Sequence, residues 1–271
     1  MESMLLKGII DVHVHSGPDN RPRKFNDIEL ATRMKNSGAR AVLLKSHVVP
    51  TMDRATIATY VTGFEVYGSI TLNNTVGGFN PYAVENALKM GAKTVWMPTE
   101  DAANHRHWVG ERGGLSAVVD GKLHKNIDDI LDLIAAHNAV LSTGHLGIEE
   151  QCILIERAKE KNVKKVVVDH PEQGMIKMPV SKQKELIEKF GVYIQRGSII
   201  EGYERPHQTN AESIKTLGAE NTVMVTDCGV VQVPFWDELM TEYITAMTAL
   251  GISAEEIDTM TRKNPAFLLG I

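Results

Sequence analysis

The chain of 271 residues has only two cysteines, Cys152 and Cys228, and neither lies in a C-x-x-C motif. This number excludes a framework of several disulfides and is typical of proteins from a reducing compartment. A dense basic tract is also missing, and 29 basic against 34 acidic side chains give a formal net charge of −5. This balance argues against a general nucleic-acid-binding protein.

Apolar runs of the ~20 residues needed to cross a bilayer are absent, as is a basic region followed by a long apolar stretch at the N-terminus. We therefore expect a cytoplasmic protein with no membrane partner. Linkers and low-complexity segments are lacking too, which predicts one domain over residues 1–271. The hydrophobic content of 43% is enough to give that domain a substantial core.

Short β-branched runs alternate with helical patterns along the chain, for example the amphipathic segments 27–38 and 181–191. Repeated strand–helix units predict parallel strands with helical crossovers, in the α/β class. Eight such units in this length predict a closed (β/α)8 TIM barrel, which ends in a C-terminal helix. The predicted strands span residues 8–15, 39–47, 65–73, 93–100, 139–146, 164–171, 192–198 and 221–229.

The longest insertion follows the fourth predicted strand, at about residues 101–126. The segment "AVVDGKL" (117–123) within it predicts a small hairpin, because an Asp-Gly pair is flanked by apolar residues. In a (β/α)8 barrel, a loop that follows a strand lies on the catalytic face. We therefore expect His105 and His107, from "HRHW" (105–108), to lie near an active site.

Histidines and charged residues stand at the carboxyl ends of several predicted strands, and these ends meet at one mouth of a parallel barrel. The side-chain period of two places His13 and His15 on one face of the first strand, and Lys45 and His47 on one face of the second. A lone histidine at a strand end is usually a polar residue with ordinary hydrogen bonds. Five strands that each end in a histidine, lysine or aspartate instead indicate one functional site. The remaining members are His145, His170 and Asp227, on the fifth, sixth and eighth strands.

Neutral imidazoles together with a carboxylate suit a divalent transition metal, zinc first, with manganese or iron as alternatives. A catalytic metal site keeps one position open for water, whose pKa falls toward ~7 when it is bound. A carboxylate beside that water can take its proton and later deliver it to a leaving group. The pattern therefore predicts a metal-dependent enzyme with one or two ions.

Four short motifs resemble the amidohydrolase superfamily: "DVHVH", "GH", "DH" and "TD" on the first, fifth, sixth and eighth predicted strands. The segment "NPAFLLG" (264–270) looks like the one that often closes those barrels, so the resemblance spans nearly the whole chain. The opening "HVHSGPDNRPR" and "LKSH" further resemble an uncharacterised branch of hydrolase-like proteins. The resemblance implies His13 and His15 on a buried α metal, His145 and His170 on an exposed β metal, and Asp227 as both α-metal ligand and general base.

One departure from that family concerns the bridge between two metals, which is usually a carboxylated lysine or a glutamate from the fourth strand. Here that strand ends in "WMPTED", without a lysine. A carboxylated Lys45 from the second strand is the expected substitute, and Glu100 is the alternative. If neither bridges, the site holds one metal. Lys45 could instead pair with Asp11 or Asp227, or bind an anionic substrate.

Candidate substrate-binding residues follow the strands that carry the expected ligands. Arg21 and Arg23 follow the first strand and Arg196 ends the seventh, and guanidinium groups suit a carboxylate or a phosphate. For Arg21 and Arg23, a solvated loop position is an equally good reading. Imidazoles can donate hydrogen bonds to a carbonyl or phosphoryl oxygen, which makes His47, His105 and His107 further candidates. We expect a small-molecule substrate, and the arginines would suit an anionic one.

The resemblance implies a metal-dependent hydrolase, in which a metal-bound hydroxide attacks an amide, cyclic amide or lactone carbonyl while Asp227 moves the proton. Three alternatives stay open: a phosphoesterase of the PHP or TatD kind, a decarboxylase or deaminase with one metal, and a binding protein with an inactive site. The substrate itself is not readable from the fold. The sequence leaves the oligomeric state open, with a homo-oligomer as the candidate because barrels of this class often dimerise.

Overall fold

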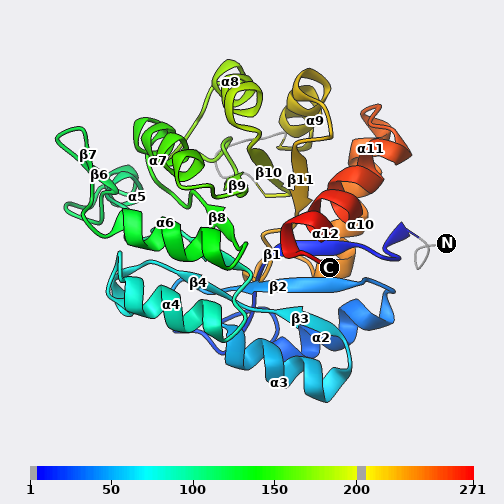
Figure 1. Cartoon of the computed structure of the whole chain (residues 1–271). Helices are drawn as coiled ribbons and strands as arrows, with labels where there is room; N and C mark the ends of the chain where they lie inside the picture. The colour runs from blue at the N-terminus through cyan, green and yellow to red at the C-terminus, as the bar shows by residue number, and fades with distance from the viewer. Residues whose placement is uncertain (1–4, 200–205) are drawn as a thin grey trace.

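The computed structural model describes residues 5–199 and 206–271, and in this part of the chain parallel strands alternate with helices (Figure 1). All pairings between the barrel strands are parallel. The barrel strands are β1 (Ile10–His15), β2 (Ala41–Lys45), β3 (Glu65–Tyr67), β4 (Ser69–Thr71), β5 (Thr94–Trp96), β8 (Val140–Ser142), β9 (Lys165–Val168), β10 (Tyr193–Gly197) and β11 (Thr222–Val225).

These strands close into a ring through two special joints. At the first, β3 pairs with β2 while β4 pairs with β5, so the third predicted strand is divided at Gly68 between two neighbours. A side chain at Gly68 would lie 2.5 Å from the Cα of Met52, which explains the glycine. At the second joint, the His15 amide donates to the Cys228 carbonyl at 2.9 Å, which joins β1 to the segment after β11. The predicted (β/α)8 barrel is confirmed.

The helices cover the outside of the ring and follow the strands in order (Figure 1). None of those in the described ranges is long and apolar enough to span a membrane. The covering helices are α2 (Asp27–Asn36), α3 (Met52–Thr62), α4 (Pro81–Lys89), α6 (Ile127–Ala136), α7 (Ile148–Glu160), α8 (Val180–Phe190), α9 (Pro206–Leu217) and α10 (Trp236–Ala249), with the short turn η1 (Asn74–Val76). The predicted C-terminal helix comprises α11 (Ala254–Asp258), the π turn η2 (Thr259–Lys263) and α12 (Asn264–Leu269).

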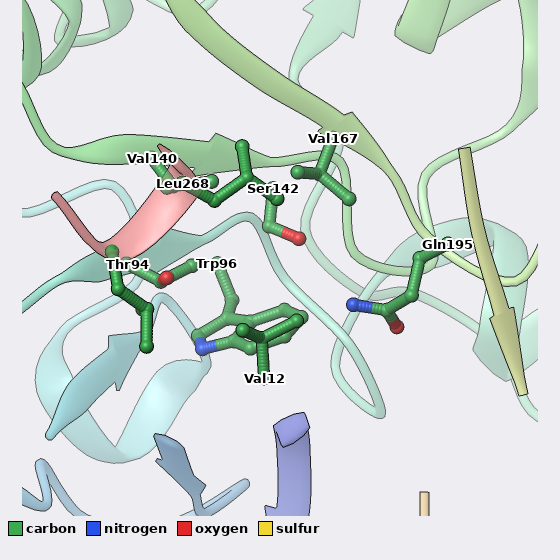
Figure 2. A pocket seen from close by; sticks show the side chains of 9 residues that line it. Val12, Thr94, Trp96, Val140, Ser142, Val167, Gln195 and Leu268 are labelled. Carbon is green, nitrogen blue, oxygen red and sulfur yellow. The ribbon is translucent and has the colours of Figure 1, made fainter. Parts of the chain in front are cut away.

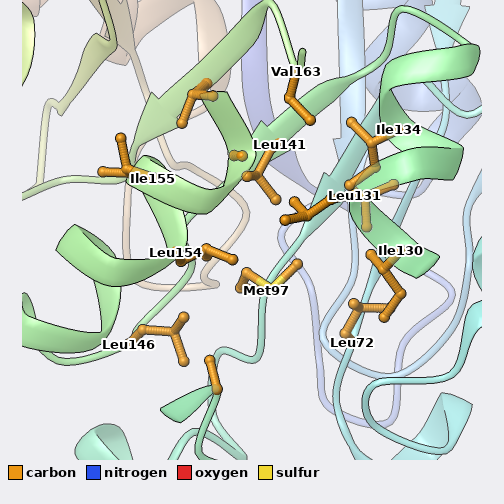
Figure 3. Packing of buried hydrophobic residues seen from close by; sticks show 14 of the residues in the cluster. Leu72, Met97, Ile130, Leu131, Ile134, Leu141, Leu146, Leu154, Ile155 and Val163 are labelled. Atoms are coloured by element: carbon orange, nitrogen blue, oxygen red, sulfur yellow. The ribbon is translucent and has the colours of Figure 1, made fainter. Parts of the chain in front are cut away.

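The core lies in two layers, one outside and one inside the ring of strands. In the outer layer, apolar side chains of α6 and α7 pack against Leu141 of β8 and Met97 at the end of β5 (Figure 3). In the inner layer, Val12, Leu43, Trp96 and Val140 meet inside the barrel, where Leu268 of α12 joins them. Burial of this apolar area on both sides of the strands holds their carboxyl ends in place.

The long insertion after β5 has the predicted hairpin and one additional helix. The hairpin pairs β6 (Val118–Val119) with β7 (Lys122–Leu123). Its two turn residues, Asp120 and Gly121, have φ of 51° and 73°, and positive φ at both central positions is what a two-residue type I′ turn requires. The helix α5 (Ala103–Trp108) contains the histidine pair of "HRHW".

A buried carboxylate, Asp11, joins the first and last strands at the second joint. Its Oδ2 accepts hydrogen bonds from the Thr226 amide at 3.0 Å, the Thr226 hydroxyl at 2.7 Å and the Trp236 indole at 2.9 Å. Its Oδ1 accepts from the His13 amide at 3.0 Å. Asp11 therefore holds β1, β11 and α10 together at the end of the barrel where the histidines lie.

Replacing Asp11 by alanine is expected to destabilise the metal-free protein by about 3–5 kcal/mol, because a buried donor left without an acceptor costs ~1–3 kcal/mol. Asp11→Asn keeps one acceptor oxygen and should cost less. Urea unfolding measures both. The matched control is Asp132→Ala, which removes a surface ion pair with Lys161 and should change stability by less than about 1 kcal/mol. Equal effects of Asp11→Ala and the control would contradict the assigned role.

Candidate metal centre

A cavity of about 400 Å³ opens at the carboxyl ends of the strands. Its lining comes from several strand ends and from the insertion, as the sequence predicted. His13 lies next to this lining, fully buried, with its ring centroid 5.3 Å from that of His15. The predicted site residues that line the cavity are His15, Arg21, Arg23, Lys45, His47, His105, His145, His170 and Asp227, and Glu100 lines it too.

A bulge in β1 turns both of its histidines toward the centre of the barrel. The register between β1 and β2 shifts between Asp11 and Val14. Val12 accordingly packs in the inner core and Val14 in the outer core, although strict alternation would place them on the same face. β-Bulges commonly re-aim side chains beside active sites. His13 and His15 share one side, as predicted, while Asp11 is left facing the joint with β11.

Three potential ligand atoms converge on one point. The His13 Nε2 lies 3.0 Å, and the His15 Nε2 3.4 Å, from the same Oδ1 of Asp227. The Lys45 Nζ lies 2.9 Å from His13 Nε2, so it reaches the same point from β2. One ligand atom from each of His13, His15 and Asp227 lies within 4.8 Å of the others. Three such ligands with a remaining open position are what a catalytic zinc site uses.

Two of the expected ligands have unusual backbone conformations. Asp227 has a φ of 53° and His170 a φ of 23°, in a region that residues other than glycine adopt at a cost of roughly 1–3 kcal/mol. Close packing enforces this at Asp227: its amide donates to the His13 carbonyl, and a side chain at Gly229 would overlap the His15 carbonyl. Local strain therefore aims the Asp227 carboxylate at the two histidines.

A second group of imidazoles surrounds His145. Its ring centroid lies 5.1 Å from that of His170 and 4.8 Å from that of His105. The Nδ1 atoms of His145 and His105 are 2.9 Å apart, so one of them donates a hydrogen bond to the other. The buried Nδ1 of His170 has no hydrogen-bond partner within the described residues. An orphaned polar atom is costly in a protein interior, and a bound cation would satisfy it.

Burial sets the protonation states of the site. It lowers the pKa of His15 and of His170 to about 3, and it lowers the pKa of His47 and His145 well below the ordinary value. Burial opposes ionisation of Asp227, but the contacts of its carboxylate with His13 and His15 hold the pKa of that carboxyl well below the usual range. At neutral pH these four imidazoles are therefore uncharged beside an ionised carboxylate, as metal binding requires.

Lys45 is almost fully buried on the inner face of β2. Its Nζ lies 4.4 Å from the Trp96 ring centroid, and burial lowers its pKa. The alternative pairing with Asp11 is wrong, because the carboxylate of Asp11 is engaged at the joint with β11. Asp169 is a buried carboxylate near this group that sequence reasoning missed. It accepts hydrogen bonds from Ser142 Oγ at 2.6 Å and from the Gly144 amide at 2.7 Å.

On β10, Arg196 does not face the cavity as the sequence predicted, and its neighbour Gln195 faces the barrel interior instead. Arg196 points outward, where its guanidinium pairs with Glu172 and donates to Gln183 Oε1 at 2.8 Å. It does not line the cavity, and its predicted substrate contact is wrong. Gln195 points inward instead, and its Oε1 lies 2.6 Å from His13 Nδ1. His107 also lies away from the cavity lining, with an exposed side chain.

The two arginines at the mouth of the cavity are already paired. Arg21 forms a bidentate ion pair with Glu100, with N–O distances of 2.7 and 2.6 Å. Arg23 pairs with the buried Asp19 at 2.7 Å. Glu100, the alternative bridge, is thereby held by Arg21, and its Oε1 lies 3.7 Å from the Nε2 of His47.

The family model that matches residues 8–195 is described as a family of unknown function, DUF6282. The chain belongs to DUF6282. No curated protein matches it.

Solved structures of similar fold extend over the whole DUF6282 chain. An amidohydrolase from Pseudomonas aeruginosa has a TM-score of 0.71 and 10% identity, over 99% of this chain and 97% of that one. An amidohydrolase from Burkholderia multivorans with bound zinc has a TM-score of 0.64 and 10% identity, over 97% and 99%. A mutant PTE-like lactonase from Deinococcus radiodurans has a TM-score of 0.62 and 13% identity, over 99% and 97%. At these identities the likeness shows the barrel fold alone.

Acidification is expected to destabilise the metal-free DUF6282 protein between pH 7 and 5. A histidine whose pKa is about 3 when folded, against an ordinary value of 6.5, binds fewer protons in the folded state than in the unfolded state. Its stabilising contribution is complete above pH 6.5 and is lost as the pH falls, by roughly 1 kcal/mol per pH unit for each such group. Asp11 and Asp169 act in the opposite direction, because burial raises the pKa of each carboxyl.

The His170→Asn variant isolates one histidine from these opposing effects. Urea unfolding in the presence of chelator should show a shallower fall in stability between pH 7 and 5 for this variant than for the wild type. Identical pH slopes for the two proteins would show that His170 is not held neutral by burial.

Proposed function

We propose that this protein is a metal-dependent hydrolase of the amidohydrolase superfamily that acts on the carbonyl group of a small molecule. The observation that supports it most is the convergence of His13, His15 and Asp227 at the mouth of the barrel. The barrel fold shared with amidohydrolases and the lowered pKa of His15 and Asp227 agree with it. The cytoplasmic location and the homo-oligomer stay predictions from the sequence.

The residues present fit one metal ion and offer ligands for another. His13, His15 and Asp227 would hold the first ion, and His145 and His170 the second, with zinc as the first choice for such ligands. A bound divalent ion supplies Lewis-acid chemistry, since it acidifies a water molecule and polarises the bond to be cleaved. The orphaned Nδ1 of His170 supports the second position.

Lys45 is proposed to join the two positions as a carboxylated lysine. Burial lowers its pKa, which favours the neutral amine. A neutral amine adds to carbon dioxide through a new N–C bond and releases a proton to solvent, which gives an anionic carbamate. Its Nζ already lies against His13 Nε2, where an ammonium would repel a cation. With the carbamate, Lys45 would present anionic oxygens from β2, in place of the bridge that the fourth strand lacks.

Asp227 is proposed to move the proton during hydrolysis. Its carboxylate is ionised at neutral pH because of His13 and His15, and it lines the cavity, so it can accept a proton from a water molecule there. The same group, once protonated, can deliver that proton to the leaving group. His47 and His105 line the cavity as well and can orient a carbonyl oxygen by hydrogen bonding.

The rest of the cavity favours a substrate with an apolar part. Five apolar side chains from the loops around the mouth form part of its wall, namely Pro22, Met175, Ile199, Val230 and Val233. Arg21 and Arg23 are neutralised by Glu100 and Asp19. An anionic substrate would therefore have to displace a carboxylate, whereas an uncharged amide, cyclic amide or lactone would not.

A decarboxylase or deaminase with a single metal is the second candidate function. It is favoured by one observation: in the described part of the chain, only the group of His13, His15 and Asp227 brings three ligand atoms within 4.8 Å. Counting the metal ions per chain separates the two candidates. Two ions favour hydrolysis with paired metals, and one ion leaves decarboxylation or deamination open.

Replacing Lys45 by alanine is expected to lower the metal content from two ions per chain to one or none, because the bridge between the positions is lost. Elemental analysis after dialysis against zinc measures the content. The matched control is Lys165→Ala, since Lys165 is a second buried lysine, at the start of β9. A wild-type metal content in Lys45→Ala would remove Lys45 from the bridge.

Asp227→Asn is expected to lower kcat by about 10²–10⁴, the usual contribution of a positioned proton-transfer group. The substrate for this assay comes from a screen of lactones, cyclic amides, N-acyl amino acids and phosphoesters. The exposed Asp53→Asn substitution serves as control and should leave kcat unchanged. Full activity of Asp227→Asn on any substrate would refute the proposed proton transfer.

A further inference from the structure

Gln195 lies in the interior of the barrel, beside the candidate metal centre. It comes from the inner face of β10 and its side chain is 1% exposed. Its Oε1 lies 2.6 Å from His13 Nδ1, on β1, which is separated from β10 in the ring only by β11. The other His13 nitrogen, Nε2, is the one that lies against Asp227 and Lys45. Gln195 therefore contacts His13 on the side opposite the proposed metal.

A carbonyl oxygen at Nδ1 decides which tautomer His13 adopts. A neutral imidazole carries one proton, so one ring nitrogen donates and the other has a lone pair. Because Oε1 of Gln195 only accepts, it requires the proton on Nδ1. This leaves the lone pair on Nε2, where the Lys45 Nζ lies at 2.9 Å and where a metal would bind.

The surroundings of Gln195 keep its amide in this orientation. Its side chain lines a small enclosed pocket in the barrel together with Val12, Trp96 and Leu268. In Figure 2 the amide nitrogen of Gln195 points toward the indole of Trp96, and the oxygen points away from it. An N–H group can lie against an aromatic face, whereas a carbonyl oxygen there gains nothing.

An apolar side chain would otherwise suit this position better. The neighbours of Gln195 in the pocket are mostly apolar, and burying an amide among them is unfavourable unless it makes hydrogen bonds. The bond to His13 is the interaction that compensates this burial. A purely structural role would be met equally well by a residue of the same length without an acceptor, such as methionine.

We propose that Gln195 is a positioning residue that holds His13 in the Nδ1–H tautomer and thereby prepares Nε2 for metal binding. The proposal rests on the metal centre of the proposed function. Partners of this type fix both the ring orientation and the tautomer of metal-binding histidines, and losing one typically weakens metal binding 10–100-fold.

The first experiment measures zinc affinity by competition with a chromophoric chelator. Gln195→Met keeps the length of the side chain but removes the acceptor, and its zinc dissociation constant should rise by about 10–100-fold. Gln195→Glu keeps an acceptor oxygen toward Nδ1 and should restore affinity to within a few-fold of the wild type. An unchanged dissociation constant in Gln195→Met, with wild-type zinc binding intact, would overturn the proposal.

Gln183→Met is the matched control for buried glutamines. Gln183 is also 1% exposed, but it bonds Arg196 and the Met178 carbonyl on the outer side of the barrel. This variant should lose stability in urea while it keeps wild-type zinc affinity. If zinc binding weakened in both Gln195→Met and Gln183→Met, in proportion to the stability that each loses, Gln195 would have only a structural role.

The second experiment reads the tautomer directly in the metal-free protein. Nitrogen-15 NMR of histidine-labelled protein distinguishes Nδ1–H from Nε2–H rings, and a His13→Gln variant assigns the His13 signal. We expect Nδ1–H in the wild type and in Gln195→Glu, and a shift toward Nε2–H in Gln195→Met. The same tautomer in Gln195→Met as in the wild type would overturn the proposal. This measurement uses metal-free protein, so its result does not depend on the proposed function. The proposed function would instead be refuted if the wild type bound no zinc.

Discussion

The hydrogen bonds of the buried Asp11 carboxylate determine where the rest of the site lies. They tie β1 to the segment after β11 and to the indole of Trp236, so the first and last strands of the barrel meet in a fixed register. The bulge in β1 follows directly, and it turns His13 and His15 inward. Asp227, two residues beyond β11, then has its backbone bonded to His13 and its carboxylate between the two imidazoles.

Burial at this mouth lowers the pKa of His15, His47, His145 and His170, which are therefore neutral at pH 7. The contacts of Asp227 with His13 and His15 keep its carboxyl ionised. Lone pairs and negative charge are then directed at one point. This arrangement destabilises the metal-free protein, because these groups repel one another until a cation binds between them. The positive φ of Asp227 and His170 adds to this destabilisation. The positive φ of both residues and the unpartnered Nδ1 of His170 therefore lie at the mouth, while the apolar inner layer and the covering helices stabilise the rest of the barrel.

The barrel and most of its mouth were predictable because they depend on periodicity and chain order. Eight strand–helix units, the Asp-Gly hairpin and the C-terminal helix follow from local patterns, and the strand-end rule placed residues such as His145 and Lys45. What failed depended on side-chain direction within a strand. In "VYIQRGS", Gln195 and Arg196 are neighbours and must face opposite sides of the strand. Arg196 was predicted to face the site because its guanidinium suits an anionic substrate. The alternation of side chains along β10 places Gln195 on the same face as Tyr193, which packs against the inner core, and this alternation can be read from the sequence.

Other features could not be predicted, since they arise from tertiary contacts between distant residues. Arg21 and Glu100 are 79 positions apart in the sequence, and their ion pair neutralises the guanidinium that was predicted to bind a substrate. The exposed position of His107, beside the cavity-lining His105, depends on the short helix α5 inside the insertion. The division of the third strand at Gly68 likewise depends on the close approach of Met52.

The most direct test of the central claim is a crystal structure of zinc-loaded protein with anomalous diffraction data collected at the zinc edge. The account predicts an anomalous peak bonded to His13 Nε2, His15 Nε2 and a carboxylate oxygen of Asp227, at about 2.0–2.2 Å from each. Peaks confined to surface histidines such as His137, with none between these three side chains, would contradict it.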